Sequence, residues 1–124
     1  MDLREINVLV LAYLGDTIYE DYIRRYLIKS GIGNVDRLQT ESIKYVSAVN
    51  QSKYLLEMID KGFFEEDELS IIKRARNYKG KTKPKNCDVA SYNNATGLEA
   101  LIGYLDLDGN YSRIEEIMNY IVGD

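Results

Sequence analysis

Apolar residues recur at helical spacing along most of this chain. The first predicted helix runs from about Leu3 to Lys29, and its apolar positions share one face: Leu11, Leu14, Ile18 and Tyr22. Ser30 and Gly31 follow and are typical of a helix end. The pattern therefore predicts a long amphipathic helix near the start of the chain.

Further helices are predicted over about residues 35–45, 47–60, 65–79, 89–107 and 111–122. The helix over 65–79 begins with acidic residues and ends with basic ones, a polarity that the helix dipole favours. Residues 80–86 are predicted to form a loop, and 108–110 a turn. No segment alternates apolar and polar residues with a period of two. We therefore expect an all-α fold with one domain over residues 1–124.

Composition limits the chemistry that this chain can perform. Histidine is absent and cysteine occurs once, at Cys87. Catalysis by a histidine base and histidine metal sites are therefore excluded, and a tetrahedral zinc site is not expected. Carboxylates would have to hold any metal ion, and they select hard cations such as Mg²⁺ or Mn²⁺. The longest apolar run, Val8–Leu14, is too short for a membrane span, and no signal sequence is evident. We expect a cytoplasmic protein without a membrane partner.

Two acidic residues interrupt otherwise apolar helices. Asp16 lies in the first predicted helix, Glu99 lies in the helix over 89–107, and neither has a lysine or arginine within four residues. An ionised carboxylate among apolar side chains is unfavourable unless it is paired or binds a metal. If packing brings the two together they repel, and a divalent cation removes that conflict.

The immediate neighbours of the two acids are small. They are expected to leave room for something that is not protein, and include Ala12, Gly15, Thr17, Thr96 and Gly103. The alternatives are structural. Asp16 can cap a helix or close a turn, and Glu99 can reach solvent from the edge of a helix.

Positive charge is concentrated in one segment. Between Lys73 and Lys85 lie seven basic residues and no acidic one, whereas the other 111 positions hold 9 basic and 20 acidic residues. A positive segment beside asparagines on an acidic body is typical of a nucleic-acid contact. The expected contacts are Arg74, Arg76, Asn77, Lys79, Lys81, Lys83, Lys85 and Asn86. The alternative is a solvated, charged loop.

Three segments carry recognisable motifs. Leu11–Glu20 contains Leu-Gly-Asp followed by Thr-Ile, Thr96–Gly103 contains Glu-Ala-Leu-Ile-Gly, and Arg74–Lys79 is followed by Pro-Lys-Asn at 84–86. The first two resemble the signature helix and the second catalytic helix of ribonuclease III endonuclease domains. The third resembles the marker of one subgroup, Mini-ribonuclease III, which has no double-stranded RNA-binding domain. The resemblance spans essentially the whole chain.

The resemblance implies a single-domain, helical, ribonuclease III-like endonuclease that works as a homodimer. Double-stranded RNA would lie in a valley across the dimer and contact the basic segment, and cleavage would leave a 5′-phosphate and a 3′-hydroxyl. Asp16 and Glu99 would be the catalytic and metal-binding acids, with Mg²⁺ as cofactor and Mn²⁺ able to substitute. Tyr13 matches an aromatic residue at the dimer interface. The implied substrate is precursor 23S ribosomal RNA, which a ribosomal protein could present.

Two of the family's four usual carboxylates are missing from this chain. Ala12 stands four residues before Asp16, and Thr96 stands three before Glu99, where the family has acids. We therefore expect one Mg²⁺, held by Asp16, Glu99 and waters. Two alternatives remain at this point: a non-catalytic RNA-binding ribosome-assembly module on the same scaffold, and a helical interaction protein whose lysine-rich loop is merely solvated.

Overall fold

The chain folds into helices throughout the part that the computed structural model describes, residues 2–78 and 87–123. A short 3₁₀ helix, η1 (Leu3–Glu5), precedes six α-helices in these ranges: α1 (Val8–Lys29), α2 (Val35–Val46), α3 (Ala48–Asp60), α4 (Glu66–Arg76), α5 (Val89–Leu107) and α6 (Tyr111–Val122). No strand occurs among the described residues. The predicted all-α fold is confirmed. None of the helices in this part of the chain has both the length and the apolar character that a membrane crossing needs.

Two helix ends differ from the prediction. The predicted first helix is interrupted because the Asn7 side chain accepts a hydrogen bond from the backbone N–H of Leu9 (2.8 Å) and so caps α1. The predicted helix over 65–79 ends at Arg76, because its C-cap residue Asn77 leaves the helical conformation, with φ −95° and ψ 2°. Local capping decides where both helix ends lie, and the spacing of hydrophobic residues carries no information about it.

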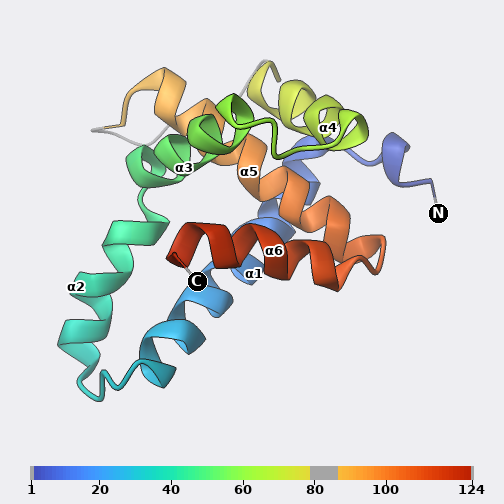
Figure 1. Cartoon of the computed structure of the whole chain (residues 1–124). Coiled ribbons are helices and arrows are strands. Elements are labelled where there is room, and N and C mark those ends of the chain that lie inside the picture. The colour runs from blue at the N-terminus through green and yellow to red at the C-terminus, as the bar shows by residue number, and fades with distance from the viewer. Residues whose placement is uncertain (1, 79–86, 124) are drawn as a thin grey trace.

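Helix α5 lies at the centre of the molecule. It contacts α1, α3, α4 and α6, and Figure 1 shows it passing between these elements. Ten of its residues are buried, on all sides of the helix. A helix that is apolar all round is expected to be enclosed by its neighbours. Any polar side chain on α5 therefore depends on those neighbours for its partners.

Helices α1 and α5 cross with their backbones in contact at two glycines. A Cβ atom at Gly15 would overlap the backbone carbonyl of Glu99, and one at Gly103 would overlap that of Leu11. Only residues without a side chain permit this approach. The crossing brings the stretch of α1 around residue 16 against the stretch of α5 around residue 99.

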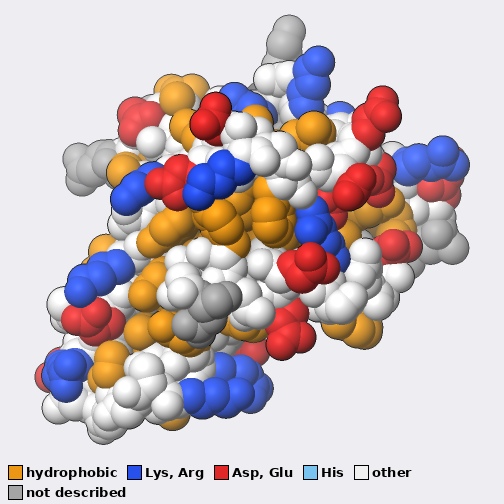
Figure 2. All heavy atoms as spheres, viewed as in Figure 1, with side chains coloured by type: hydrophobic (Ala, Val, Ile, Leu, Met, Phe, Trp, Pro, Cys, Tyr) orange, Lys and Arg blue, Asp and Glu red, His pale blue; other side chains and the backbone are white. Residues whose placement is uncertain are grey.

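Glu68, a buried acid of α4, has a cationic partner. Glu68 of α4 is 3% exposed, and Arg113 of α6 donates to its two oxygens at 2.9 Å. Arg113 also lies over the Phe63 ring, 4.5 Å from its centroid. Figure 2 shows charged side chains of both signs around hydrophobic ones on the face that includes α6. The Glu68–Arg113 pair joins α4 to α6 and is fully accounted for by structure.

Candidate active site

Asp16 of α1 and Glu99 of α5 line one cavity of about 390 Å³. The close crossing at Gly15 places them there, since Asp16 follows directly the glycine that touches the Glu99 carbonyl. Val46 and Gln51, from the junction of α2 and α3, form part of the wall. Among the described residues that line the cavity there is no lysine or arginine. The two acids thus meet without a protein cation in the cavity wall, unlike Glu68.

The two carboxyl groups have different environments. Asp16 is exposed, whereas Glu99 is largely covered. Burial is the main cause that raises the pKa of Glu99 from its ordinary 4.5 to about 9, and the charge of Asp16 and a hydrogen bond with it act in the same direction. In the metal-free protein at neutral pH, the Glu99 carboxyl therefore holds a proton. This is the expected state of a carboxyl group that is buried beside a second one.

Gln51 contacts Glu99 and was not among the site residues predicted from the sequence. The Gln51 side chain is 3% exposed, and its Nε2 atom donates to the Val46 carbonyl (3.0 Å) and to Glu99 Oε2 (3.4 Å). A signal was present in the sequence. Gln51 shares a helix face with Leu55 and Met58, both fully buried, so it is a polar residue on an apolar face.

The small residues near the acids have two separate roles. Ala12 and Thr96 line the cavity, as expected of residues that leave space beside a carboxylate. The same expectation was wrong for Gly15 and Gly103, because the space they leave is filled by the backbone of the opposite helix. The glycines create the site by bringing the helices together, and the other two residues keep it open.

The donor set fits one hydrated Mg²⁺ ion. Mg²⁺ in proteins keeps several waters and takes one or two carboxylates together with substrate phosphate oxygens. Asp16 and Glu99 supply two such groups beside a cavity with room for waters. Within the described residues no group of three or more acidic, histidine or cysteine side chains could hold a metal ion. The expectation of a single ion stays a prediction.

Three of the expected nucleic-acid contacts lie at the end of α4. Arg74 and Asn77 are exposed, and Arg76 is partly covered. The Arg76 side chain packs on α5, because a Cβ at Gly97 would lie 3.0 Å from Arg76 Cγ. Gly97 adjoins Thr96, a residue of the acid-lined cavity. The basic end of α4 thus reaches the helix that carries Glu99.

The other expected contacts lie outside the described residues. They are Lys79, Lys81, Lys83, Lys85 and Asn86. Arg76 and Asn77 also line a cavity of about 350 Å³ together with Ile59 of α3 and further residues of α4, Lys73 among them. The described part of the basic segment therefore borders one hollow of its own.

Tyr13 lies at the rim of the acid-lined cavity. It lines this cavity and is nevertheless 82% exposed. Val10 on the same helix and Val49 on α3 are also more than half exposed, at 57% and 58%. The expected contact of Tyr13 with a second subunit stays a prediction.

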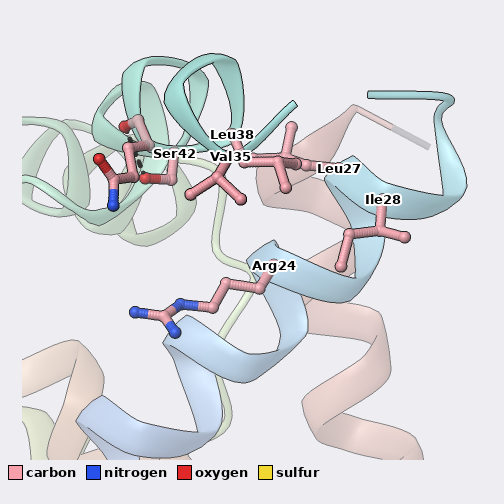
Figure 3. Close-up of a pocket in the computed structure, with 7 residues that line it drawn as sticks. Arg24, Leu27, Ile28, Val35, Leu38 and Ser42 are labelled. Atoms are coloured by element: carbon pink, nitrogen blue, oxygen red, sulfur yellow. Dashed lines mark hydrogen bonds between the residues drawn. The ribbon is translucent and has the colours of Figure 1, made fainter. Parts of the chain in front are cut away.

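A further cavity, of about 270 Å³, lies away from the acids. It is formed by the last turns of α1 and by α2, and Figure 3 shows Leu27, Ile28, Val35 and Leu38 facing it beside the Arg24 guanidinium. Its lining, among the described residues, includes no acid. Helix α2, which has no buried residue, provides one wall. This hollow has none of the chemistry of the Asp16–Glu99 cavity.

Comparison with known proteins agrees with this geometry. Residues 9–110 match the family model of the ribonuclease III domain. Mini-ribonuclease 3 of Streptococcus pneumoniae is 39% identical over 98% of this chain and 95% of that protein, and Mini-ribonuclease 3 of Enterococcus faecalis is 41% identical over 98% and 92%. The crystal structure of a Fusobacterium nucleatum protein superposes with a TM-score of 0.89 at 35% identity, and the match covers 100% of this chain and 99% of that one.

The fold and site define a helical nuclease domain with paired carboxylates. The chain belongs to the ribonuclease III family, in its Mini-ribonuclease 3 group. It is an endoribonuclease that acts on double-stranded RNA. The two alternatives that the sequence left open, a non-catalytic module and a purely structural helical protein, are not favoured by these matches.

Proposed function

We propose that this endoribonuclease hydrolyses double-stranded RNA at the Asp16–Glu99 cavity with Mg²⁺, or with Mn²⁺ in its place. The observation that carries this proposal is that two acids from distant parts of the chain, Asp16 and Glu99, line the same cavity. The pKa of Glu99 is raised, and the described lining of the cavity has no basic residue. Clefts with perturbed titratable groups are where catalytic chemistry is concentrated.

Asp16 and Glu99 would hold the ion through their carboxylate oxygens. When bound, a divalent cation activates a water for attack on phosphorus and neutralises charge on the phosphate. Asp16 is the more exposed of the two acids and would lie nearer the approaching RNA, whereas the more buried Glu99 accepts a hydrogen bond from Gln51. Glu99 would release its proton when the ion binds, because the cation favours the charged carboxylate. Breakage of the bond between phosphorus and O3′ leaves a 5′-phosphate and a 3′-hydroxyl.

RNA would be held mainly through its backbone. Arg74, Arg76 and Asn77 lie at the end of α4, which reaches α5 next to the cavity, and the basic residues that follow would extend the same contact. Arginine and asparagine are common donors to phosphate and ribose groups. Such contacts give affinity that falls steeply with salt and depends little on sequence.

The working unit would be a homodimer joined beside Tyr13. Two copies would place two acid-lined cavities on one duplex, one for each strand. The second copy would also double the phosphate contacts that the basic segment of one chain supplies. The exposed Tyr13, Val10 and Val49 supply an apolar surface for this contact.

The proposed biological substrate is precursor 23S ribosomal RNA in the cytoplasm. A-form duplexes hide their base edges in a deep and narrow groove, so backbone contacts alone select poorly among duplexes. A ribosomal protein bound to the precursor would supply the missing selectivity by presenting one duplex to the dimer.

A cleavage assay tests the role of the two acids. We expect Asp16→Asn and Glu99→Gln each to abolish cleavage of a plain RNA duplex in Mg²⁺, with binding of the duplex retained, and EDTA to stop the wild type. Asp21→Asn is the matched control, because Asp21 lies on α1 outside the cavity and pairs with Arg25. Cleavage at the wild-type rate by Asp16→Asn would refute the proposed site.

A further inference from the structure

Gln51 has an unusual set of hydrogen bonds for a buried amide. The Nε2 atom donates two hydrogen bonds, to the Val46 carbonyl and to Glu99 Oε2. Its Oε1 atom is buried and has no hydrogen-bond partner among the residues that the structure describes. An unpartnered buried carbonyl oxygen is unfavourable, so the amide is not explained by structural stability alone.

The direction of the amide is fixed by its neighbours. The Val46 carbonyl can only accept a hydrogen bond, so the Nε2 atom of Gln51 must face it. If the amide group were flipped, Oε1 would lie against that carbonyl and against Glu99. The second Nε2 hydrogen is then directed to Glu99 Oε2. Val46 is the last residue of α2, so the amide joins the α2–α3 junction to the acid on α5.

A neighbouring pair shows what a purely structural link between these helices looks like. Ser52, the next residue on α3, accepts a hydrogen bond of 2.8 Å from Asn94 Nδ2 of α5, and both side chains are buried. This bond joins α3 to α5, and neither residue lines the acid-lined cavity. The docking of α3 on α5 thus has its own polar contact, close to Gln51 and independent of Glu99.

We propose that Gln51 is a positioning residue, which holds the Glu99 carboxylate in the orientation that binds the divalent cation. The inference rests on the proposed function, in which Asp16 and Glu99 hold that ion. The bond to Oε2 restrains rotation of the carboxylate and leaves its other oxygen for the ion. Hydrogen-bonded partners of metal-ligating carboxylates fix ligand geometry, and their loss typically lowers metal affinity by about 10–100-fold.

Mn²⁺ binding to the RNA-free protein provides the test, measured by the electron paramagnetic resonance of free Mn²⁺. Gln51→Met keeps the length of the side chain and removes the donor, and we expect its Kd for Mn²⁺ to rise about tenfold or more. Gln51→Asn retains an amide but withdraws it from Glu99, and the same direction is expected. Ser52→Ala is the matched control, since it removes a buried α3–α5 hydrogen bond that does not involve an acid.

Cleavage at varied Mg²⁺ gives a second readout. For Gln51→Met we expect the Mg²⁺ concentration at half-maximal rate to rise by a similar factor, while the rate at saturating Mg²⁺ recovers most of the wild-type value. Ser52→Ala is expected to lower the unfolding midpoint and to leave both metal constants within twofold of the wild type. A role of Gln51 in stability alone would instead lower the unfolding midpoint of Gln51→Met and leave its metal constants within twofold of the wild type.

The outcomes separate this inference from the proposed function. One outcome refutes the role of Gln51 and leaves the metal site standing. In that outcome the wild type binds Mn²⁺, Asp16→Asn does not, and both folded Gln51 variants bind with a Kd within twofold of the wild type. If the wild type does not bind Mn²⁺, or Asp16→Asn binds it equally well, both proposals fall. Weakened binding in the Gln51 variants together with unchanged binding in Ser52→Ala supports the positioning role.

Discussion

The raised pKa of Glu99 makes a quantitative prediction about stability in the absence of metal. Burial and the proximity of Asp16 raise the pKa from 4.5, its ordinary value, to about 9 in the folded protein. Between these limits the folded protein holds a proton that the unfolded chain has released. The folded state binds more protons there, so its stability must decrease as the pH rises.

The sign and the size follow from linkage. The contribution of Glu99 to stability is fully present below about pH 4.5 and is lost progressively as the pH rises toward 9. Each pH unit inside this window lowers the free energy of unfolding by roughly 1.4 kcal/mol. From pH 6 to pH 8 the wild type is therefore expected to lose up to about 3 kcal/mol through this one group.

Glu99→Gln isolates this effect, because the amide has nearly the same shape and does not titrate. We expect the free energy of unfolding of the variant, from urea denaturation in EDTA, to depend much less on pH than that of the wild type. Glu115→Gln, at an exposed position of α6, is the control and should follow the wild type. Adding Mg²⁺ at pH 8 should stabilise the wild type and leave Glu99→Gln unchanged. Equal losses in the wild type and Glu99→Gln would refute the reasoning.

Three further perturbations probe the rest of the molecule. Gly103→Ala should destabilise the fold by about 1–3 kcal/mol or more in urea denaturation, because its Cβ would overlap the Leu11 carbonyl. Gly33→Ala is the control and should not destabilise the fold, because the space around Gly33 is open. Similar unfolding midpoints for the two variants would contradict the close crossing of α1 and α5. If the protein forms the proposed dimer, Tyr13→Ala should shift it toward monomer in analytical ultracentrifugation, with Tyr111→Ala as an exposed control. A dimer unchanged by Tyr13→Ala would remove Tyr13 from the proposed interface. Arg74→Ala should weaken duplex binding at low salt and reduce the slope of log affinity against log salt by about 1, while Lys29→Ala should not; equal slopes would exclude a phosphate contact at Arg74.

Local patterns in the sequence determine most of the secondary structure and part of the site. Hydrophobic spacing is a property of neighbouring residues, and it predicted the six α-helices to within a few residues at most ends. The absence of histidine limits the possible chemistry without reference to any fold. Asp16 and Glu99 stood out because an acid within an apolar helix is unfavourable wherever that helix packs.

Only the tertiary structure decides how these pieces act on one another. Gly15 and Gly103 were expected to leave space, and instead they bring two backbones together, because the facing surface of the other helix is not encoded in the neighbours of a glycine. The difference in burial between Asp16 and Glu99, and hence the raised pKa of one of them, also depends on that crossing. Gln51 became relevant only when α3 packed on α5. The sequence names the candidate reacting groups, whereas the distances and the dielectric environment that govern them arise from long-range packing.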